Sequence, residues 1–170
     1  DDDDLVATFK RNDWSEGLGN DSYLHALGYM DLMLRHTTHF LRMFTGAEGE
    51  GLLHTLKPRF PSTMKRIKKN GGLARIIVAA PRANRENMFA AVQEAGYSEL
   101  EVTQAVPASG ATFSHFVVSD FDMAREEEPH KELSDTDPID LVKATIYLNN
   151  RTRATTLTKK FDQIWDALKQ

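Results

Sequence analysis

The spacing of apolar residues changes along the chain, and each change predicts a new structural element. After Asp21 and Ser22, both good helix caps, apolar residues recur every three or four positions, which is typical of an amphipathic helix. Over residues 37–45 they alternate instead, as in a strand with two different faces. Helical spacing returns over residues 53–67 and ends at Asn70-Gly71-Gly72, where glycine allows a left-handed cap. An apolar run over 75–80 then predicts a buried strand.

The second half of the chain predicts more strands than helices. A helix is expected between Asn84 and Gly96, followed by strands over 100–106, 113–119 and 144–148, with a polar acidic stretch over 125–137. The last helix begins at about residue 152. Its predicted apolar face consists of Leu157, Phe161, Ile164, Trp165 and Leu168. Alternating helices and strands favour parallel pairing, and clustered strands favour antiparallel pairing, so we predict an α/β fold with a mixed β-sheet flanked by helices.

Length and composition limit the possible classes of protein. With 170 residues, 41% hydrophobic and 27% charged, the chain reads as one globular α/β domain over residues 21–170, after a flexible lead-in over residues 1–20. The chain opens on Asp1, so we expect a fragment of a larger protein. No apolar run approaches the roughly 20 residues that cross a bilayer. With no cysteine there is neither a disulfide nor a thiolate ligand, and we expect a cytoplasmic protein.

The net charge of −4 means that any anion-binding role must rest on a local basic patch, and two patches are candidates. They are Lys65, Arg66, Lys68 and Lys69 in the second predicted helix, and Arg151, Arg153, Lys159 and Lys160 at the start of the last helix. The first has an ordinary explanation as a solvated helix face, with contact to phosphate on lipid or nucleic acid as the alternative. The second lies at a helix start, which prefers anions, and a bound anion would relieve the repulsion.

The histidines give no convincing metal site in the sequence. His36 and His39 would share a face on a helix, but in a strand they would not, and no third ligand can be argued. His130 lies among acids and is expected to be solvated, and the run Glu126–Glu128 is explained by solubility. The glycines of residues 46–51 lack the spacing of a phosphate loop, so no cofactor is expected.

One strand and its surroundings resemble a known superfamily. The strand Phe113-Ser-His115-Phe-Val-Val-Ser-Asp120 ends in an acid; it follows a helix, Gly-Gly and Arg-Ile-Ile-Val, and precedes Asn149-Asn150 and a closing helix with Phe161-Asp-Gln-Ile-Trp165. This order is similar to one half of the phospholipase D superfamily, over roughly residues 23–168. Members carry HxKxxxxD on such a strand, usually followed by a GSxN turn. The His attacks phosphorus, the Lys holds phosphate oxygens and the Asp orients the His.

The sequence departs from that motif in either register. If Asp120 is aligned with the Asp of the motif, His115 occupies the position of the Lys and Phe113 the position of the His. If His115 is aligned with the His of the motif, Val117 occupies the position of the Lys and Asp122 the position of the Asp. No GSxN turn follows Asp122. The resemblance therefore implies a catalytically inactive phospholipase D-like half-domain, used as a sensor or docking module. His115, Asp120 and Asp122 are the candidate site residues, although a strand histidine and two turn-capping acids are the ordinary explanation.

The resemblance also implies partners. The superfamily usually joins two halves, so a single copy suggests a homodimer or a missing second half. The ligand would be a phosphate-bearing molecule, such as nucleic acid or phospholipid, or a protein. The alternative is an active phosphodiesterase or nuclease with a non-standard site in which His115 is the nucleophile. A structural interaction domain with no small ligand is a third possibility.

Overall fold

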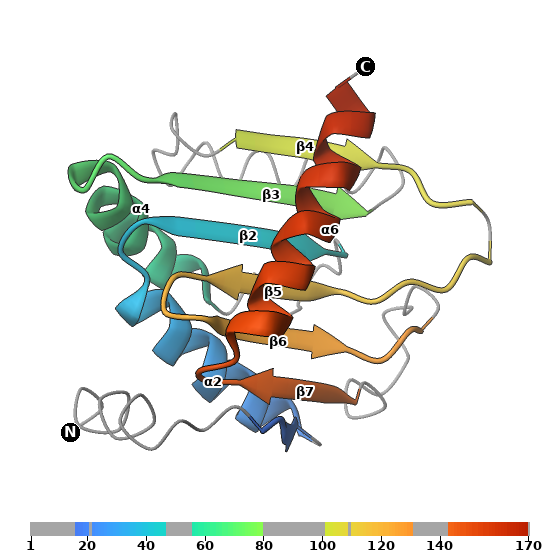
Figure 1. The fold of residues 1–170 in the computed structure, drawn as a ribbon, viewed down its shortest axis with the longest axis horizontal. Helices are drawn as coiled ribbons and strands as arrows, with labels where there is room; N and C mark the ends of the chain where they lie inside the picture. The colour runs from blue at the N-terminus through green and yellow to red at the C-terminus, as the bar shows by residue number, and fades with distance from the viewer. Residues whose placement is uncertain are drawn as a thin grey trace.

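The computed structural model describes residues 16–20, 22–46, 56–79, 101–108, 110–130 and 143–169. Within these residues a seven-stranded mixed sheet has the order β1-β7-β6-β5-β2-β3-β4. Helix α6 crosses one face of the sheet, and α2 and α4 cover the other (Figure 1). The strands are β1 (Leu18–Asn20), β2 (Phe40–Thr45), β3 (Leu73–Ala79), β4 (Glu101–Ala105), β5 (Phe116–Ser119), β6 (Met123–Glu127) and β7 (Ala144–Tyr147). The helices are α2 (Tyr23–His36), the 3-10 turn η1 (Lys57–Arg59), α4 (Phe60–Lys69) and α6 (Arg151–Lys169).

The sheet combines a parallel and an antiparallel part, as the sequence predicts. β2, β3 and β4 pair in parallel, while β5, β6, β7 and β1 continue the sheet in antiparallel pairs. β5 is the central strand, and β3 lies beside the edge strand β4. β1 adds residues 18–20 to one edge of the sheet, beside β7, so the sheet begins before residue 21. The predicted helix over residues 84–96 lies outside the described residues.

Alternation along the strands divides the core between the two faces of the sheet. Leu41, Met43 and Ile76 pack with α2 and α4, whereas Phe44 and Ile77 pack with α6. Because neighbouring strand residues point to opposite faces, each central strand supplies both cores. This explains why β3 and β5 are apolar at almost every position.

The closing helix docks mainly through its aromatic residues. Leu157, Phe161 and Trp165 are buried, and the rings of Phe161 and Trp165 stack with centroids 5.8 Å apart. The guanidinium of Arg75 on β3 lies 5.0 Å from the centre of the Trp165 ring. Leu168, predicted on the same face, is instead 38% exposed, and the C-terminal end of α6 extends beyond β4 (Figure 1).

Helix ends follow the predicted signals. The side chain of Ser22 accepts a hydrogen bond from His25 N–H at the start of α2. At the end of α4, Gly71 has φ +69°, and a Cβ on Gly72 would stand 1.9 Å from the carbonyl oxygen of His39. The two glycines therefore let the chain turn sharply into β3 beside β2. No helix in the described part of the chain is long and apolar enough to cross a membrane.

Candidate functional site

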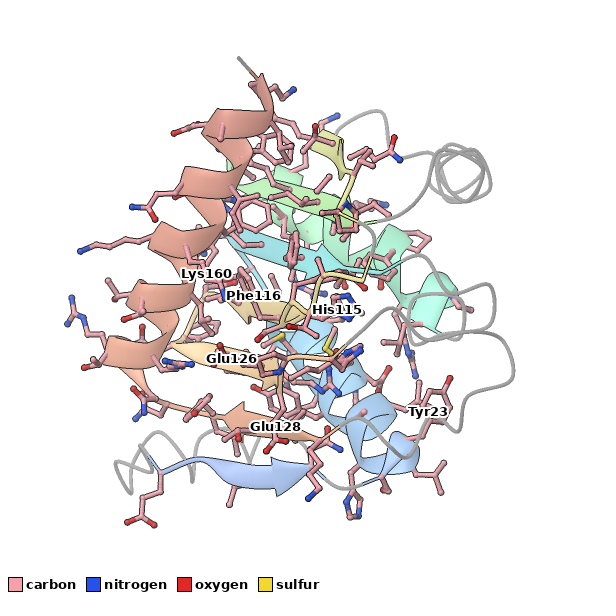
Figure 2. The ribbon with its side chains drawn as sticks, turned by 90° about the vertical axis from the view of Figure 1, so that its right-hand side faces the viewer. Tyr23, His115, Phe116, Glu126, Glu128 and Lys160 are labelled. Atoms are coloured by element: carbon pink, nitrogen blue, oxygen red, sulfur yellow. The ribbon has the colours of Figure 1, made fainter. Side chains whose placement is uncertain are left out.

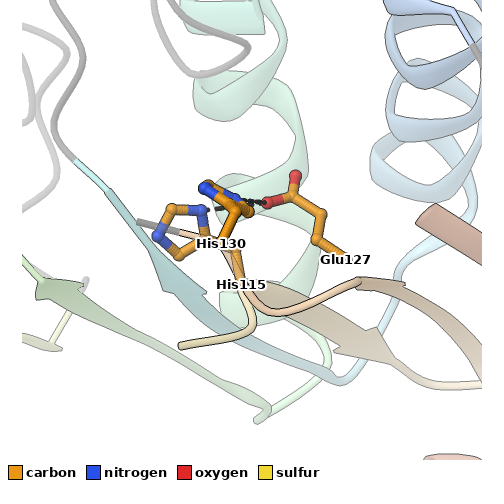
Figure 3. Close-up of side chains that lie close together, drawn as sticks. All are labelled: His115, Glu127 and His130. Carbon is orange, nitrogen blue, oxygen red and sulfur yellow. Dashed lines mark hydrogen bonds and ion pairs between the residues drawn. The ribbon is translucent and has the colours of Figure 1, made fainter. Parts of the chain in front are cut away.

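A group of buried charged side chains lies where β5 begins and β6 ends. His115 directly precedes β5, Glu127 closes β6, and His130 follows three residues later (Figure 3). The backbone holds them together, because Glu127 N–H donates to the His115 carbonyl at 2.9 Å and residues 113 and 130 form an antiparallel bridge. This end of the sheet is also where the parallel strands β2, β3 and β4 end. Ligands of open α/β sheets bind outside the carboxyl ends of such strands.

The Glu127 carboxylate is the centre of this group. Its Oε2 lies 3.0 Å from Nδ1 of His115 and 3.1 Å from Nε2 of His130, and its Oε1 accepts from Nη1 of Arg125 at 2.5 Å. Burial raises the pKa of Glu127, but bonding from the two rings and the charge of Arg125 more than offset this and hold that pKa well below its usual range. Glu127 is therefore an ionised carboxylate in the interior.

Arg125 connects this carboxylate to the first strand and the first helix. Its Nε donates to Oδ1 of Asn20 at 3.1 Å, and Asn20 in turn donates from Nδ2 to the Ser22 carbonyl at 2.8 Å. Nearby, the Tyr29 hydroxyl lies within hydrogen-bond distance of the carbonyls of Ala124 and Tyr147. Burial raises the pKa of Tyr29 far above its ordinary value, so Tyr29 stays neutral.

His115 is held firmly but is incompletely satisfied. It is 7% exposed and is surrounded by the rings of Phe44, Phe113 and His130. Its Nδ1 faces Glu127, whereas Nε2 is buried and has no hydrogen-bond partner. A buried ring nitrogen without a partner costs about 1–3 kcal/mol. Such an atom is uncommon in folded proteins and calls for a specific explanation, such as a bound water, an ion or a catalytic role.

Asp120 lies at the other end of β5 and does not contact His115. Its Oδ2 accepts from the N–H groups of Thr38 and His39 at 2.7 and 3.0 Å, and from the Thr38 hydroxyl. Asp122 has φ +58° in the β5–β6 turn, and its carbonyl accepts from Asn150 N–H at 3.0 Å. Asp120 therefore fixes the segment between α2 and β2 and not the turn after its own strand, whereas Asp122 lies in that turn with a left-handed backbone.

Both registers of the family motif place an apolar residue where the chemistry needs a polar one. Phe113, at the His position of the first register, packs against Phe44 with ring centroids 5.8 Å apart. Val117, at the Lys position of the second register, is buried in the core beneath α2 and α4. Neither side chain can attack or clamp a phosphate. Within the described residues, this strand therefore lacks the histidine and the lysine, two residues apart, that the family motif requires.

The two basic patches lie on opposite faces of the sheet, since one belongs to α4 and the other to α6 (Figures 1 and 2). Arg66 is a structural residue: its Nε donates to the Thr37 carbonyl at 2.7 Å and its Nη2 to the Leu34 carbonyl at 2.5 Å. Burial lowers the pKa of Arg66 below its ordinary value, although the negative charge of Asp120 offsets part of this decrease. Arg153 is ion-paired with Glu126. The remaining members are exposed: Lys65, Lys68, Lys69, Arg151, Lys159 and Lys160.

Two members of the buried group are not what the sequence pattern predicts. Solubility does not explain Glu127, which is 8% exposed, and His130, expected to be solvated, is half-buried against it. The polar acidic stretch begins within strand β6. The sequence feature that could have indicated this is the two-residue repeat of a β-strand, which places Arg125 and Glu127 on the same face.

The fold is that of known phospholipase D-like proteins. No family model and no curated protein matches the sequence. Among solved structures, TrmBL2, an archaeal chromatin protein with a novel mode of DNA binding, superposes with a TM-score of 0.61 at 10% identity, covering 97% of this chain. This chain spans 59% of the length of TrmBL2.

Two further structures share the fold. Polyphosphate kinase from Porphyromonas gingivalis has a TM-score of 0.54 at 11% identity, covering 94% of this chain and 27% of its own. Nuc from Salmonella typhimurium, a phospholipase D family member, has a TM-score of 0.52 at 12% identity, with 89% of this chain and 95% of Nuc covered. These likenesses define a phospholipase D-like α/β fold, as the sequence predicts.

Proposed function

We propose that this phospholipase D-like domain is a catalytically inactive binding module within a larger protein, and that it docks a phosphate-bearing ligand. The observation that carries the proposal is the exposed face of α6. Arg151, Lys159 and Lys160 are exposed there, and residues 151–160 contain no acid. An uncompensated basic face attracts phosphate by Coulomb attraction and counterion release.

The basic residues of α4 are a weaker candidate, because the fold explains them without a ligand. Lys68 and Lys69 lie in the last turn of α4, where positive charge interacts favourably with the helix dipole. Arg151 lies in the first turn of α6, where the same dipole opposes it and favours an anion. This difference in position makes α6 the preferred docking surface.

The broken motif supports binding without turnover. In the superfamily, hydrolysis needs an accessible His and a Lys clamp, whereas Nε2 of His115 is buried and Val117 belongs to the core. Because TrmBL2, which shares the fold, binds DNA, duplex DNA is the first ligand to test here, with anionic phospholipid vesicles as the second.

The test compares two matched triple variants in a duplex-DNA titration followed by fluorescence anisotropy. Arg151→Gln/Lys159→Gln/Lys160→Gln removes three charges from α6, and Lys65→Gln/Lys68→Gln/Lys69→Gln removes three from α4. We expect the α6 variant to bind at least about 10-fold more weakly and to have a log–log salt slope reduced by about 2–3. Equal weakening by both variants would mean that only net charge matters and would contradict the docking surface.

An active phosphodiesterase is the second candidate, and one observation favours it. The Glu127 carboxylate holds Nδ1 of His115 and leaves Nε2 unbonded, as in oriented catalytic imidazoles. Release of nitrophenol from bis(p-nitrophenyl) phosphate that disappears in both His115→Asn and Glu127→Gln would establish this function. Under our proposal the wild-type protein gives no such turnover.

The single repeat also bears on the oligomeric state. We infer either a homodimer or docking against a second phospholipase D-like half, because the superfamily commonly pairs two halves about an axis. Light scattering of the purified chain checks this, with a dimer mass expected if pairing occurs between identical copies.

A further inference from the structure

Three side chains able to bind a metal ion converge within the described part of the chain. Nδ1 or Nε2 of His115 and His130 and one carboxylate oxygen of Glu127 all lie within 4.8 Å of one another. They come from two adjoining segments, the entry to β5 and the exit from β6 (Figure 3). Both imidazole rings turn a nitrogen toward the same oxygen, Oε2. The rings themselves are nearly perpendicular, with an interplanar angle of 88°.

The separations approach those of a tetrahedral metal centre. Bonds of about 2.0–2.1 Å to nitrogen and oxygen place neighbouring ligand atoms about 3.3 Å apart. The two N···O separations are 3.0 and 3.1 Å, and the two nitrogens lie within 4.8 Å of each other. The His130 side chain is the more exposed of the two, at 18% against 9% for His115, and so has more room to adjust its ring toward an ion.

The surroundings prepare these ligands for a cation. Arg125 donates to Oε1 of Glu127, so that Oε2, the oxygen that both imidazole rings face, is the one placed to bind an ion in monodentate fashion. Outer hydrogen bonds of this kind fix the orientation of metal ligands. The backbone hydrogen bond from Glu127 to His115 and the bridge between residues 113 and 130 fix the spacing of the three side chains.

We propose that His115, Glu127 and His130 form a binding site for a divalent transition metal, with Zn²⁺ as the best match. Two imidazoles and one carboxylate are ligands that zinc accepts, and three protein ligands leave a fourth position for water or another ligand. On binding, each neutral ring carries its proton on the nitrogen that faces away from the ion. This site goes beyond the docking function of α6, and either can hold without the other.

The experiment measures Zn²⁺ binding to the purified chain by isothermal titration, with Co²⁺ as a spectroscopic reporter. We expect a stoichiometry of one and visible Co²⁺ absorption bands of four-coordinate intensity. His130→Asn should weaken Zn²⁺ binding by at least about 100-fold, because it removes a direct ligand. His130 is half-buried, so this variant is the least disruptive of the three, and circular dichroism confirms that it is folded.

His39→Gln is the matched control. His39 also lies near a carboxylate, with its Nδ1 3.7 Å from Oδ2 of Asp120, but at the opposite end of β5. Its Zn²⁺ affinity should equal that of the wild type. Absence of one-to-one binding in the wild type, retained affinity in His130→Asn, or an equal loss in His39→Gln would each overturn the proposal.

Discussion

Each end of strand β5 has a buried carboxylate, and the two are satisfied by different partners. Asp120 accepts hydrogen bonds from two backbone N–H groups and one hydroxyl of the neighbouring segment. Glu127 accepts only from side chains, those of Arg125, His115 and His130. A backbone N–H group can only donate a hydrogen bond to the carboxylate, whereas an imidazole nitrogen can bind either a proton or a metal ion. The comparison therefore separates an acid with a purely structural environment from one whose partners suit the metal site that we propose.

The largest effect is expected at the Asp120 end. Asp120→Ala leaves the N–H groups of Thr38 and His39 without their acceptor in a part-buried turn. Charge-assisted hydrogen bonds and buried orphan donors together predict a loss of about 3–5 kcal/mol in the free energy of unfolding. Urea denaturation measures this, with exposed Asp166→Ala as the control at under about 0.5 kcal/mol. A loss below about 1 kcal/mol would show that Asp120 does not hold this turn.

At the Glu127 end, removing the negative charge without changing the side-chain shape should be enough to lower the free energy of unfolding. Glu127→Gln keeps the shape but leaves the 4% exposed Arg125 without a counter-charge, and we expect a loss of about 2–4 kcal/mol. A double-mutant cycle with Arg125→Gln checks the cause. The double variant should lose less than the sum of the two single variants by at least about 1 kcal/mol. Additive losses would mean that the two side chains act independently.

Acid should remove the stabilisation that the Glu127 charge provides. The pKa of folded Glu127 lies below the unfolded value of about 4.3, so its stabilisation is complete above that pH and is lost as the pH falls toward the folded pKa. Unfolding free energies between pH 7 and pH 3 should therefore fall more steeply for the wild type than for Glu127→Gln. Parallel curves for the two proteins would contradict the assigned pKa direction.

The smallest effect is expected from a single hydroxyl. Thr38→Val removes the side-chain hydrogen bond to Asp120 but keeps both backbone donors, so we expect a loss of about 1–2 kcal/mol. Thermal unfolding followed by circular dichroism measures it. A loss as large as that of Asp120→Ala would mean that the hydroxyl, and not the backbone, is the main partner.

Local patterns in the sequence were sufficient to predict most of the helices and strands that the structure describes. Ser22 caps α2, Gly71 and Gly72 end α4, and the alternation of Leu41 and Met43 with Phe44 correctly divides β2 between two cores. These features depend on interactions between residues close in sequence, so their spacing carries the information. Asp120 differs, because its position after a strand indicates a local turn whereas its partners, Thr38 and His39, lie about 80 residues earlier in the chain.

Only the tertiary structure decided what the polar residues do. A period of two places Arg125 and Glu127 on one face of β6, but the burial of that face depends on pairing with β5 in the observed register, Val117 opposite Arg125. A slip of one residue would turn Glu127 away from His115. Likewise, the sequence showed two basic patches of similar charge, and the fold placed them on opposite faces of the sheet and used Arg66 and Arg153 within it. Contacts between residues distant in sequence set these roles, and no local pattern records them.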